Sequence, residues 1–278
     1  MFIRAITIRN VQGIKTLSWR PPKNQSVGWH VILGDNASGK SSFLRATSVA
    51  LLGPTDAVAA RQDWNLWVRR GCTRAAISVQ VVPSTFDVPE PSAIEDREKF
   101  YTAAVVLYPT TKTEVANIRP RHDESCPMWR SPKGWFSASY GPFRRFAGGD
   151  KDVQSLVSSS PRLGAHISLL GENAALPEGP AWLQQLKFES YEDQSVARPL
   201  IEIVTDFINQ DDFLPNGVKL KNITSRGVEF SDSSGASILA QNLSDGYRSL
   251  LSMTFELLRQ LARVFSPTQL FDLTGTKV

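Results

Sequence analysis

The chain has 278 residues, which suits one large domain or a core domain with a sizeable insertion. Hydrophobic residues make up 41% of it, which is enough for a hydrophobic core, and the 21% of charged residues is ordinary for a soluble protein. The net charge of +4 is compatible with nucleic acid as a partner but does not indicate one.

The sequence points neither to a membrane nor to an oxidising compartment. The N-terminus has no signal-peptide layout, and no stretch approaches the roughly 18 apolar residues of a membrane-spanning helix. Cys72 and Cys126 lie far apart, without the spacing of a metal site. We therefore expect a cytoplasmic protein with two free thiols and no membrane partner.

The N-terminal part of the chain predicts strands followed by a helix. Residues 2–8 alternate in polarity and predict a strand, and residues 14–19 predict a second strand after a turn at Gln12 and Gly13. The apolar run 27–33 predicts a third strand. From Lys40 the apolar spacing becomes helical, and Gly53 with Pro54 predicts the end of that helix.

The remainder predicts an insertion followed by a return to regular structure. Strands are expected at 76–82 and 103–107, whereas residues 109–180 show little periodicity and predict irregular structure. Helices are expected at 182–188 and 196–210, and a hairpin at 218–220 and 228–230. Ser244 then begins a long amphipathic helix that reaches Phe265.

We accordingly expect an α/β fold with a mixed sheet, an antiparallel β-subdomain and an irregular or helical insertion. The expected domains are an N-terminal lobe at 1–108, an insertion at 109–215 and a C-terminal segment at 216–278 that carries the hairpin and the long helix.

Residues 34–41 satisfy G-x-x-x-x-G-K-[ST], the phosphate-binding P-loop or Walker A motif, at every fixed position. A predicted strand precedes the motif and a predicted helix follows it, which is the context that the chemistry requires. The glycines allow the backbone N–H groups to point at a phosphate, and the helix dipole favours an anion at the same place. A glycine-rich turn that binds nothing is the alternative.

The motif predicts an ATP and Mg²⁺ site. Lys40 is expected to contact the β- and γ-phosphates, and the Ser41 hydroxyl to bind Mg²⁺. The full set of predicted nucleotide-binding residues is Gly34, Asn36, Ala37, Ser38, Gly39, Lys40, Ser41 and Ser42.

A second motif, Leu-Ser-Asp-Gly at residues 243–246, lies at the start of the long predicted helix. Ser244 suits a helix N-cap and Asp245 suits the first turn, and capping alone would explain the serine. The motif also resembles the signature of ABC-type ATPases. That resemblance implies that Ser244 and Gly246 contact the γ-phosphate of an ATP held by the other subunit.

The order of these elements resembles the ATPase heads of the SMC/RecF/OLD group, which act in DNA repair, chromosome organisation and phage defence. The opening segment 4–10 followed by Gly13 is similar to the first strand and turn of those heads. The resemblance implies that Arg9 and Asn10 lie near the base or ribose. Solvated strand residues are the alternative.

Residues 140–146 and 182–186 are similar to segments of AAA-type ATPases of bacterial defence systems, in particular the ATPase subunit of the Septu system. That subunit acts with an HNH nuclease, so the resemblance implies a nuclease partner. The irregular region also mixes basic and aromatic side chains that would suit DNA or RNA, or else a solvated loop. These are Arg119, Arg121, Arg130, Lys133, Arg144, Arg145 and Lys151, with Trp129, Trp135, Tyr140 and Phe143.

One expected feature is missing from the sequence. ABC-type heads follow the signature helix with a strand that ends in Asp-Glu, the Walker B pair, whose glutamate activates water. Here Asp272 follows Leu270 and Phe271, but Leu273 stands where the glutamate is expected. No catalytic base is therefore assigned. We expect a longer protein or a diverged tail, and weak ATP hydrolysis by these 278 residues alone.

Three functions remain open from the sequence. The first is an ABC-type ATPase head that forms a head-to-tail homodimer or higher oligomer around ATP. The second is an ATP-sensing scaffold that does not hydrolyse its nucleotide. The third is a P-loop kinase, which would leave Ser244 and Gly246 without a role.

Overall fold

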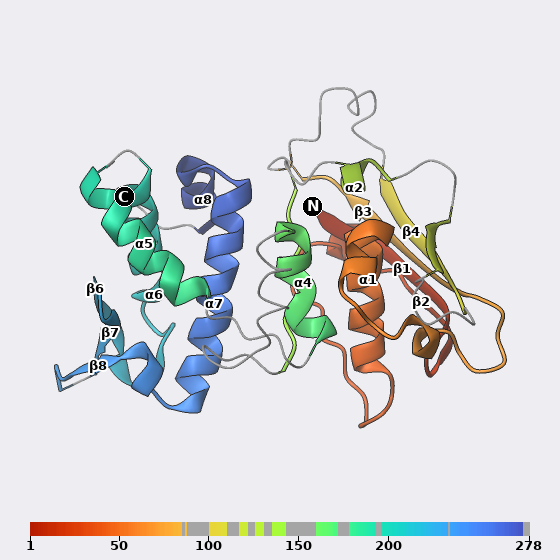
Figure 1. The fold of residues 1–278 in the computed structure, drawn as a ribbon, viewed down its shortest axis with the longest axis horizontal. Coiled ribbons are helices and arrows are strands. Elements are labelled where there is room, and N and C mark those ends of the chain that lie inside the picture. Colours follow the sequence, from red (N-terminus) through yellow and green to blue (C-terminus); the bar gives the residue numbers. More distant parts are fainter. Residues whose placement is uncertain are drawn as a thin grey trace. The chain divides into compact units, whose positions relative to one another are not determined.

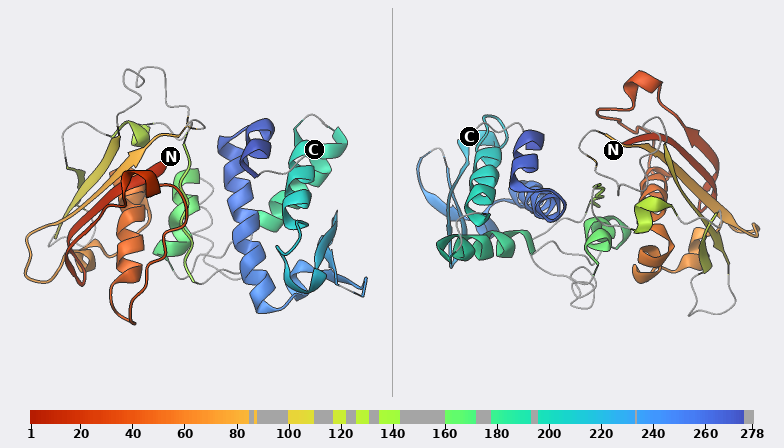
Figure 2. Two further views of the ribbon diagram at one scale, coloured as in Figure 1. Left: turned by 180° about the vertical axis from the view of Figure 1, so that it is seen from behind. Right: turned by 90° about the horizontal axis from the view of Figure 1, so that it is seen from above.

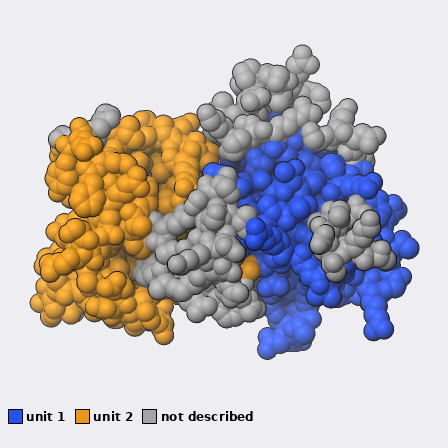
Figure 3. Space-filling model, in the orientation of Figure 1, with its two compact units in different colours: residues 1–139, 156–170 blue, residues 140–155, 171–278 orange. Residues whose placement is uncertain are grey.

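The structure is a computed structural model of the chain (Figure 1). It describes residues 1–84, 87, 100–109, 117–121, 126–130, 135–142, 160–171, 178–192, 196–232 and 234–274. The chain divides into two compact units, coloured in Figure 3. Unit 1 is Met1–Ser139 with Leu156–Leu170, and unit 2 is Tyr140–Ser155 with Gly171–Val278. The domain boundaries expected from the sequence remain a prediction.

Unit 1 contains a five-stranded sheet in the order β2-β1-β3-β4-β5, with every pair antiparallel. Its strands are β1 (Phe2–Val11), β2 (Ile14–Trp19), β3 (Ala75–Val82), β4 (Tyr101–Tyr108) and β5 (Asn117–Pro120). Burial alternates along β3, as expected for a strand with one face on the core.

The register of the sheet aligns the buried side chains. Ile8 of β1 is paired with Leu17 of β2 and Ile77 of β3. Ile8 and Ile77 are fully buried. Each such side chain contributes about 1.5–3 kcal/mol by leaving water. The hydrophobic alternation in the sequence therefore sets the register, because a one-residue slip would turn these side chains to solvent.

Three helices of unit 1 pack near the sheet: α1 (Lys40–Ala59), α2 (Pro127–Arg130) and α4 (Pro161–Leu170). α1 lies on the sheet, and α4 packs against α1 (Figures 1 and 2). The buried face of α1 carries Ala46, Val49 and Ala50. Gly53 leaves the helical conformation with φ +80°, so α1 kinks where its end was predicted and resumes at Pro54.

In its described residues, unit 2 combines four helices with a small antiparallel sheet of order β6-β7-β8. Its elements are α5 (Glu178–Glu192), α6 (Ala197–Ile208), α7 (Asp245–Val264), α8 (Pro267–Thr274), β6 (Lys219–Thr224), β7 (Gly227–Ser231) and β8 (Ser237–Leu239). Phe230 of β7 and Phe255 of α7 are fully buried in its core. Short 3-10 turns are η1 (Lys23–Gln25), η2 (Trp64–Trp67), η4 (Pro215–Gly217) and η5 (Ala240–Asn242).

A buried charged cluster lies within α7. Arg259 donates hydrogen bonds to both carboxylate oxygens of Glu256, at 2.8 and 2.7 Å, and the Gln260 amide donates to the same carboxylate at 2.6 Å. Both charged side chains are almost fully buried. Removing one partner would leave the other charge uncompensated, so the pair acts as a unit. Burial and the nearby Glu256 carboxylate raise the pKa of Tyr140, while Arg259 opposes the shift.

The predicted strand at 27–33 is wrong. Within the described residues the stretch pairs with no strand, and Figure 2 shows it as a loop that leads to the start of α1. For this reason the predicted mixed sheet is also wrong for the described residues, in which both sheets are antiparallel. An apolar run becomes a strand only when neighbouring strands satisfy its backbone.

The region 109–180 contains more regular structure than its sequence predicted. α4 is a buried helix that begins after Ser160, whose carbonyl accepts a hydrogen bond from Gly164 N at 2.9 Å. Ser160 followed by Pro161 is a helix-start signal, but the short helix was obscured by its glycine and proline content. β5 and α2 in this region were also missed, as was β8 further along the chain. Lys133, Phe143, Arg144, Arg145 and Lys151 lie outside the described residues, as does the side chain of Arg130.

The other predicted elements are confirmed. β3, β4, α5 and α6 form where the periodicity indicated, with boundaries moved by a few residues, and the hairpin becomes β6 and β7. Asp272 lies in the helix α8 and not at the end of a strand, although its side chain is outside the description. None of the helices in the described part of the chain is long and apolar enough to cross a membrane.

We predict that Gly179→Ala destabilises unit 2. A Cβ atom at Gly179 in α5 would lie 2.7 Å from Cβ of Phe255 and 3.3 Å from the backbone nitrogen of Glu256, both in α7. The helices must separate to accept it, which should cost about 1–3 kcal/mol in urea unfolding. Gly246→Ala is the matched control, since Gly246 has open space around it. Equal stability of the two variants would contradict the close packing of α5 on α7.

Candidate phosphate-binding site

The predicted phosphate-binding loop is a tight turn at the N-terminus of α1. Ser38 N donates to the Asp35 carbonyl at 3.2 Å, and Phe43 N donates to the Gly39 carbonyl at 2.8 Å, which begins the helix. Ala37 and Gly39 have φ values of +64° and +94°, in the left-handed region. Gly39 reaches that region at little cost, whereas Ala37 is strained there. Residues 34–38 are all exposed to solvent.

The Lys40 ammonium folds back over this turn. Its Nζ donates hydrogen bonds to the carbonyl oxygens of Gly34 and Asp35, each at 2.6 Å. A lysine carries three donors and no acceptor, so it contributes a compact positive charge at the mouth of the turn. The residues that the motif places together therefore do lie together, and their binding of a phosphate remains a prediction.

The two serines that follow differ in their surroundings. The Ser41 side chain is exposed, and within the described residues its hydroxyl has no hydrogen-bond partner. Ser42 is half-buried, and its hydroxyl donates to Oε1 of Gln12 at 2.6 Å. Ser41 thus presents an oxygen to solvent beside the loop, whereas Ser42 connects α1 to the turn between β1 and β2.

Gln12 is a residue of the candidate site that the sequence prediction missed. It occupies the turn between β1 and β2 with φ +48°, next to Asn10 with φ +55°. Ile14 packs close to Gly39, since a Cβ at Gly39 would lie 3.5 Å from the Ile14 side chain. The turn therefore packs against the start of α1. The sequence signal that could have identified Gln12 was a polar residue in the turn of the first predicted hairpin.

The segment 67–74 supports the turn between β1 and β2 through hydrogen bonds. Gln12 N donates to the Trp67 carbonyl at 2.9 Å, and Arg69 N donates to the Asn10 carbonyl at 2.8 Å. The Arg69 guanidinium donates to the Gly13 carbonyl at 2.7 Å. These bonds fix both arms of the turn, so the position of Gln12 beside Ser42 is held by the backbone and not by its own side chain alone.

The neighbourhood of the turn is positively charged. Residues 1–20 and 64–82 contain no aspartate or glutamate. Five basic side chains lie in or beside this turn and the segment 67–74: Arg9, Lys15, Arg69, Arg70 and Arg74. A concentration of positive charge without compensating carboxylates attracts polyanions such as a triphosphate.

Arg9 and Asn10 lie at the end of β1, three and two residues before Gln12. Arg9 is exposed on β1 opposite Thr16 and Ala76, while the Asn10 amide donates to the Arg74 carbonyl at 3.4 Å. Their predicted contact with a base or ribose remains a prediction.

The second motif lies at the start of α7, in unit 2. Ser244 occupies the N-cap position, but its side chain makes no capping hydrogen bond. Its carbonyl accepts from Arg248 N at 3.0 Å. Asp245 forms an ion pair with Arg248 on the helix surface. Ser244 and Gly246 are both exposed at the helix N-terminus, so their groups are open to a ligand or a partner.

Comparison with known proteins gives distant structural likenesses. No protein-family model matches the chain, and no curated protein matches its sequence. An SMC head bound to the C-winged-helix domain of ScpA is similar over 99% of this chain and 86% of its own, at 14% identity and a TM-score of 0.49.

Two further SMC structures are similar at comparable distance. The SMC head domain with an extended coiled coil bound to the C-terminal domain of ScpA, from Pyrococcus furiosus, has 13% identity and a TM-score of 0.46 over 94% of this chain and 79% of its own. A chain from work on ATP-driven dimerization and DNA-stimulated activation of SMC ATPases has 14% identity and a TM-score of 0.34 over 58% and 93%. These TM-scores are below 0.5, so the likeness does not establish a shared fold or function.

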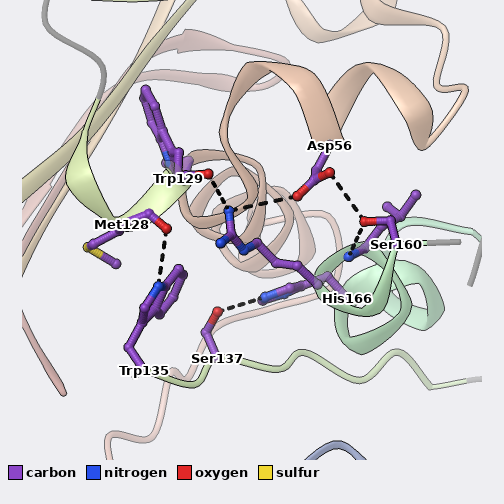
Figure 4. Close-up of polar contacts among 10 residues, drawn as sticks. Asp56, Met128, Trp129, Trp135, Ser137, Ser160 and His166 are labelled. Atoms are coloured by element: carbon purple, nitrogen blue, oxygen red, sulfur yellow. Dashed lines mark hydrogen bonds and ion pairs between the residues drawn. The ribbon is translucent and has the colours of Figure 1, made fainter. Parts of the chain in front are cut away.

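A second polar cluster in unit 1 is structural. His166 of α4 is fully buried between two serines of the preceding segment. Its Nε2 lies 2.9 Å from the Ser137 hydroxyl, drawn in Figure 4, and its Nδ1 lies 2.8 Å from the Ser139 hydroxyl. Both ring nitrogens are satisfied inside the protein, so His166 holds the segment on α4 and is not placed to act on a ligand.

Arg162 extends this cluster toward α1. Its guanidinium donates to the Trp129 carbonyl at 3.2 Å and lies 3.8 Å from the Asp56 carboxylate. The same guanidinium lies over the Trp135 ring, 5.1 Å from its centre. Asp56 also accepts from the Ser160 hydroxyl at 3.2 Å (Figure 4). Together these contacts connect α1, α2 and α4.

We predict that His166 makes the protein sensitive to acid. Burial, assisted by the Arg162 charge, lowers the pKa of His166 from 6.5 to about 3. Below pH 6.5 the unfolded chain gains a proton that the folded protein does not accept until about pH 3. Stability from this group is therefore complete above pH 6.5 and falls by about 1.4 kcal/mol per pH unit between these values. Urea unfolding of His166→Gln should show a shallower loss of stability than the wild type over that range. Parallel curves would contradict the assignment.

Proposed function

We propose that residues 34–42 bind the phosphates of ATP. The observation that carries the proposal is the arrangement of Lys40, whose ammonium lies on the carbonyls of a left-handed turn at a helix N-terminus. Backbone N–H groups at a helix N-terminus and a lysine at its first position together form an anion site. The basic cluster beside the turn supports a ligand with several negative charges.

The same loop fits a magnesium ion bound with the nucleotide. Mg²⁺ favours oxygen ligands and is commonly held by one protein oxygen, substrate phosphates and water. Ser41 offers an exposed hydroxyl at the start of α1, without a competing partner among the described residues. When bound, the ion would neutralise phosphate charge, while Lys40 and the loop hold the phosphates in place.

We predict that Lys40→Ala lowers ATP affinity by roughly ten- to a hundredfold, because hydrogen bonds to charged groups contribute about 1.5–3 kcal/mol. Isothermal titration with ATP and Mg²⁺ measures the change. Lys23→Ala, at an exposed lysine in η1, is the matched control and should bind as the wild type does. Unchanged affinity in Lys40→Ala, with an unchanged melting temperature, would remove the basis for this site.

We further propose that the nucleotide site is completed by a second copy of the chain. Ser244 and Gly246 would contact the γ-phosphate of an ATP held by the partner's loop, in a head-to-tail dimer. The exposed position of both residues at the N-terminus of α7 supports this, because an uncapped helix N-terminus favours an anion. ATP would then stabilise the dimer through its different affinity for the two states.

We predict that Ser244→Arg abolishes ATP-dependent self-association while the ATP affinity of the monomer is retained. The longer side chain would occupy the space of the γ-phosphate contact. Light scattering coupled to size-exclusion chromatography, with and without ATP, measures the association. Gln185→Arg is the control, because it adds the same charge at an exposed position of α5 where Glu189 can pair with it. ATP-dependent association that survives in Ser244→Arg would contradict the proposed sandwich.

The wider role follows from the resemblance described above. An ATP-dependent dimer of this kind would act as a switch on a nuclease subunit or on DNA, in phage defence or DNA repair. Nucleic acid could contact the basic residues Arg119 and Arg121, which are exposed on and after β5.

A non-hydrolysing ATP sensor is the second candidate function. It is favoured by the sequence after α7, in which Leu273 follows Asp272 and no glutamate stands beside it. Slow ATP turnover by the dimer, under conditions where ATP is fully bound, would support the sensor. Rapid turnover would identify an ATPase and require a base elsewhere in the chain.

A further inference from the structure

The turn between β1 and β2 has a backbone conformation that its own residue types do not favour. Asn10 and Gln12 have φ values of +55° and +48°, and neither residue is a glycine. Residues other than glycine keep a left-handed backbone only where their surroundings hold it. The turn itself consists of Gln12 and Gly13, which is too short to supply that restraint from within. Neighbouring residues must therefore fix its shape.

Arg69 contacts this turn through both its backbone and its side chain. Its N–H donates to the Asn10 carbonyl at 2.8 Å, and its guanidinium donates to the Gly13 carbonyl at 2.7 Å. The two bonds therefore lie on either side of Gln12. A hydrogen bond from a charged donor is stronger than one between neutral groups, so the guanidinium is a firm tether for the Gly13 carbonyl.

Arg69 differs in this respect from the other basic residues near the turn. Within the described ranges, the side chains of Arg9, Lys15, Arg70 and Arg74 make no hydrogen bond and no ion pair with the protein. The Arg69 side chain is instead engaged by the turn. The basic residues therefore do not form one uniform group, and Arg69 has a structural contact that the others lack.

Two contacts transmit the position of the turn to the phosphate-binding loop. Gln12 Oε1 accepts a hydrogen bond from the Ser42 hydroxyl at 2.6 Å. The buried Ile14 side chain packs beside Gly39, where an added Cβ would lie 3.5 Å from it. Gly39 is the N-cap of α1 and Ser42 lies in its first turn, so both contacts act where the loop joins the helix. Because packed interiors leave little slack, a shift of the turn would disturb the start of α1.

We propose that Arg69 is a positioning residue for the phosphate-binding loop and acts through the turn between β1 and β2. Arg69 holds the turn, and Gln12 and Ile14 hold the start of α1 against it. For its effect on ATP, this inference rests on the function proposed above. A direct contact between Arg69 and the nucleotide is the alternative. Direct contact would leave the nucleotide-free loop unchanged, whereas positioning alters the loop before any ligand binds.

Hydrogen exchange of the nucleotide-free protein tests the proposal without ATP. In Arg69→Met, the amide of Phe43, which donates to the Gly39 carbonyl at the start of α1, should exchange at least about tenfold faster than in the wild type. Arg69→Lys keeps a charged donor and should restore most of the protection. Amides of α5 in unit 2 should not change. Unchanged exchange at Phe43 in Arg69→Met would overturn the proposal.

Arg70→Met is the matched control for the exchange experiment. It removes the same charge from the next residue, whose side chain has no contact with the turn in the described structure, so Phe43 should stay protected. Equal loss of protection in Arg69→Met and Arg70→Met would show an effect of charge alone and contradict positioning. Arg69→Gln, which is shorter and uncharged, replaces Arg69→Met with the same expectation if the methionine variant does not fold.

A double-mutant cycle in ATP affinity tests the route through Gln12. By isothermal titration, Arg69→Met and Gln12→Ala should each weaken ATP binding by roughly three- to tenfold, because each removes one hydrogen bond that supports the loop. The double variant should bind little more weakly than the weaker single variant, since both changes break one series of contacts. Fully additive losses would mean that Arg69 acts independently of the turn, which would overturn the proposal.

The two measurements distinguish failure of this inference from failure of the proposed function. A wild type that binds no ATP would refute the nucleotide site, and faster exchange at Phe43 in Arg69→Met would still support the positioning role. ATP binding by the wild type, together with unchanged Phe43 exchange in Arg69→Met, would retain the site and reject the role of Arg69.

Discussion

The hydrogen bond between Ser42 and Gln12 is the contact on which the geometry of the candidate site depends. It joins the first turn of α1 to the turn between β1 and β2, two elements that meet at the phosphate-binding loop. Hydrogen bonds between segment 67–74 and Asn10, Gln12 and Gly13 hold the turn between β1 and β2 in place. The loop itself has few internal contacts, so its shape is supported by these neighbours. The five-stranded sheet of unit 1 thereby gives a solvent-exposed loop a defined position.

Much of this arrangement could be predicted from the sequence because it rests on local signals. The alternation in β1 and β3 and the helical spacing after Lys40 identified the elements, and the P-loop motif identified the turn. Local patterns report which face of an element is buried. They do not report which loops lie beside each other. Gln12 and Arg69 therefore escaped prediction, since their contacts join residues that are 30 and 56 positions apart.

The failure at residues 27–33 has a different cause. Their apolar run predicts a buried strand, but a strand exists only where a neighbour pairs with it, and the described residues provide none. The hydrophobic pattern indicated side chains that favour burial and could not indicate which element would cover them. In α4 the opposite happened, because a buried helix was hidden by Pro161 and Gly164 despite the helix-start signal at Ser160. Both cases show tertiary context overriding local propensity.

The contacts of Lys40 have a consequence for ligand selection. Its ammonium donates hydrogen bonds to two carbonyl oxygens of the loop itself. A phosphate bound in the proposed site would compete with those carbonyls for two of the three ammonium donors. A neutral ligand offers no better acceptor, whereas a polyphosphate does, because charge-assisted hydrogen bonds are stronger. In the proposed site, the internal contacts of the lysine would therefore favour highly charged ligands over weakly charged ones.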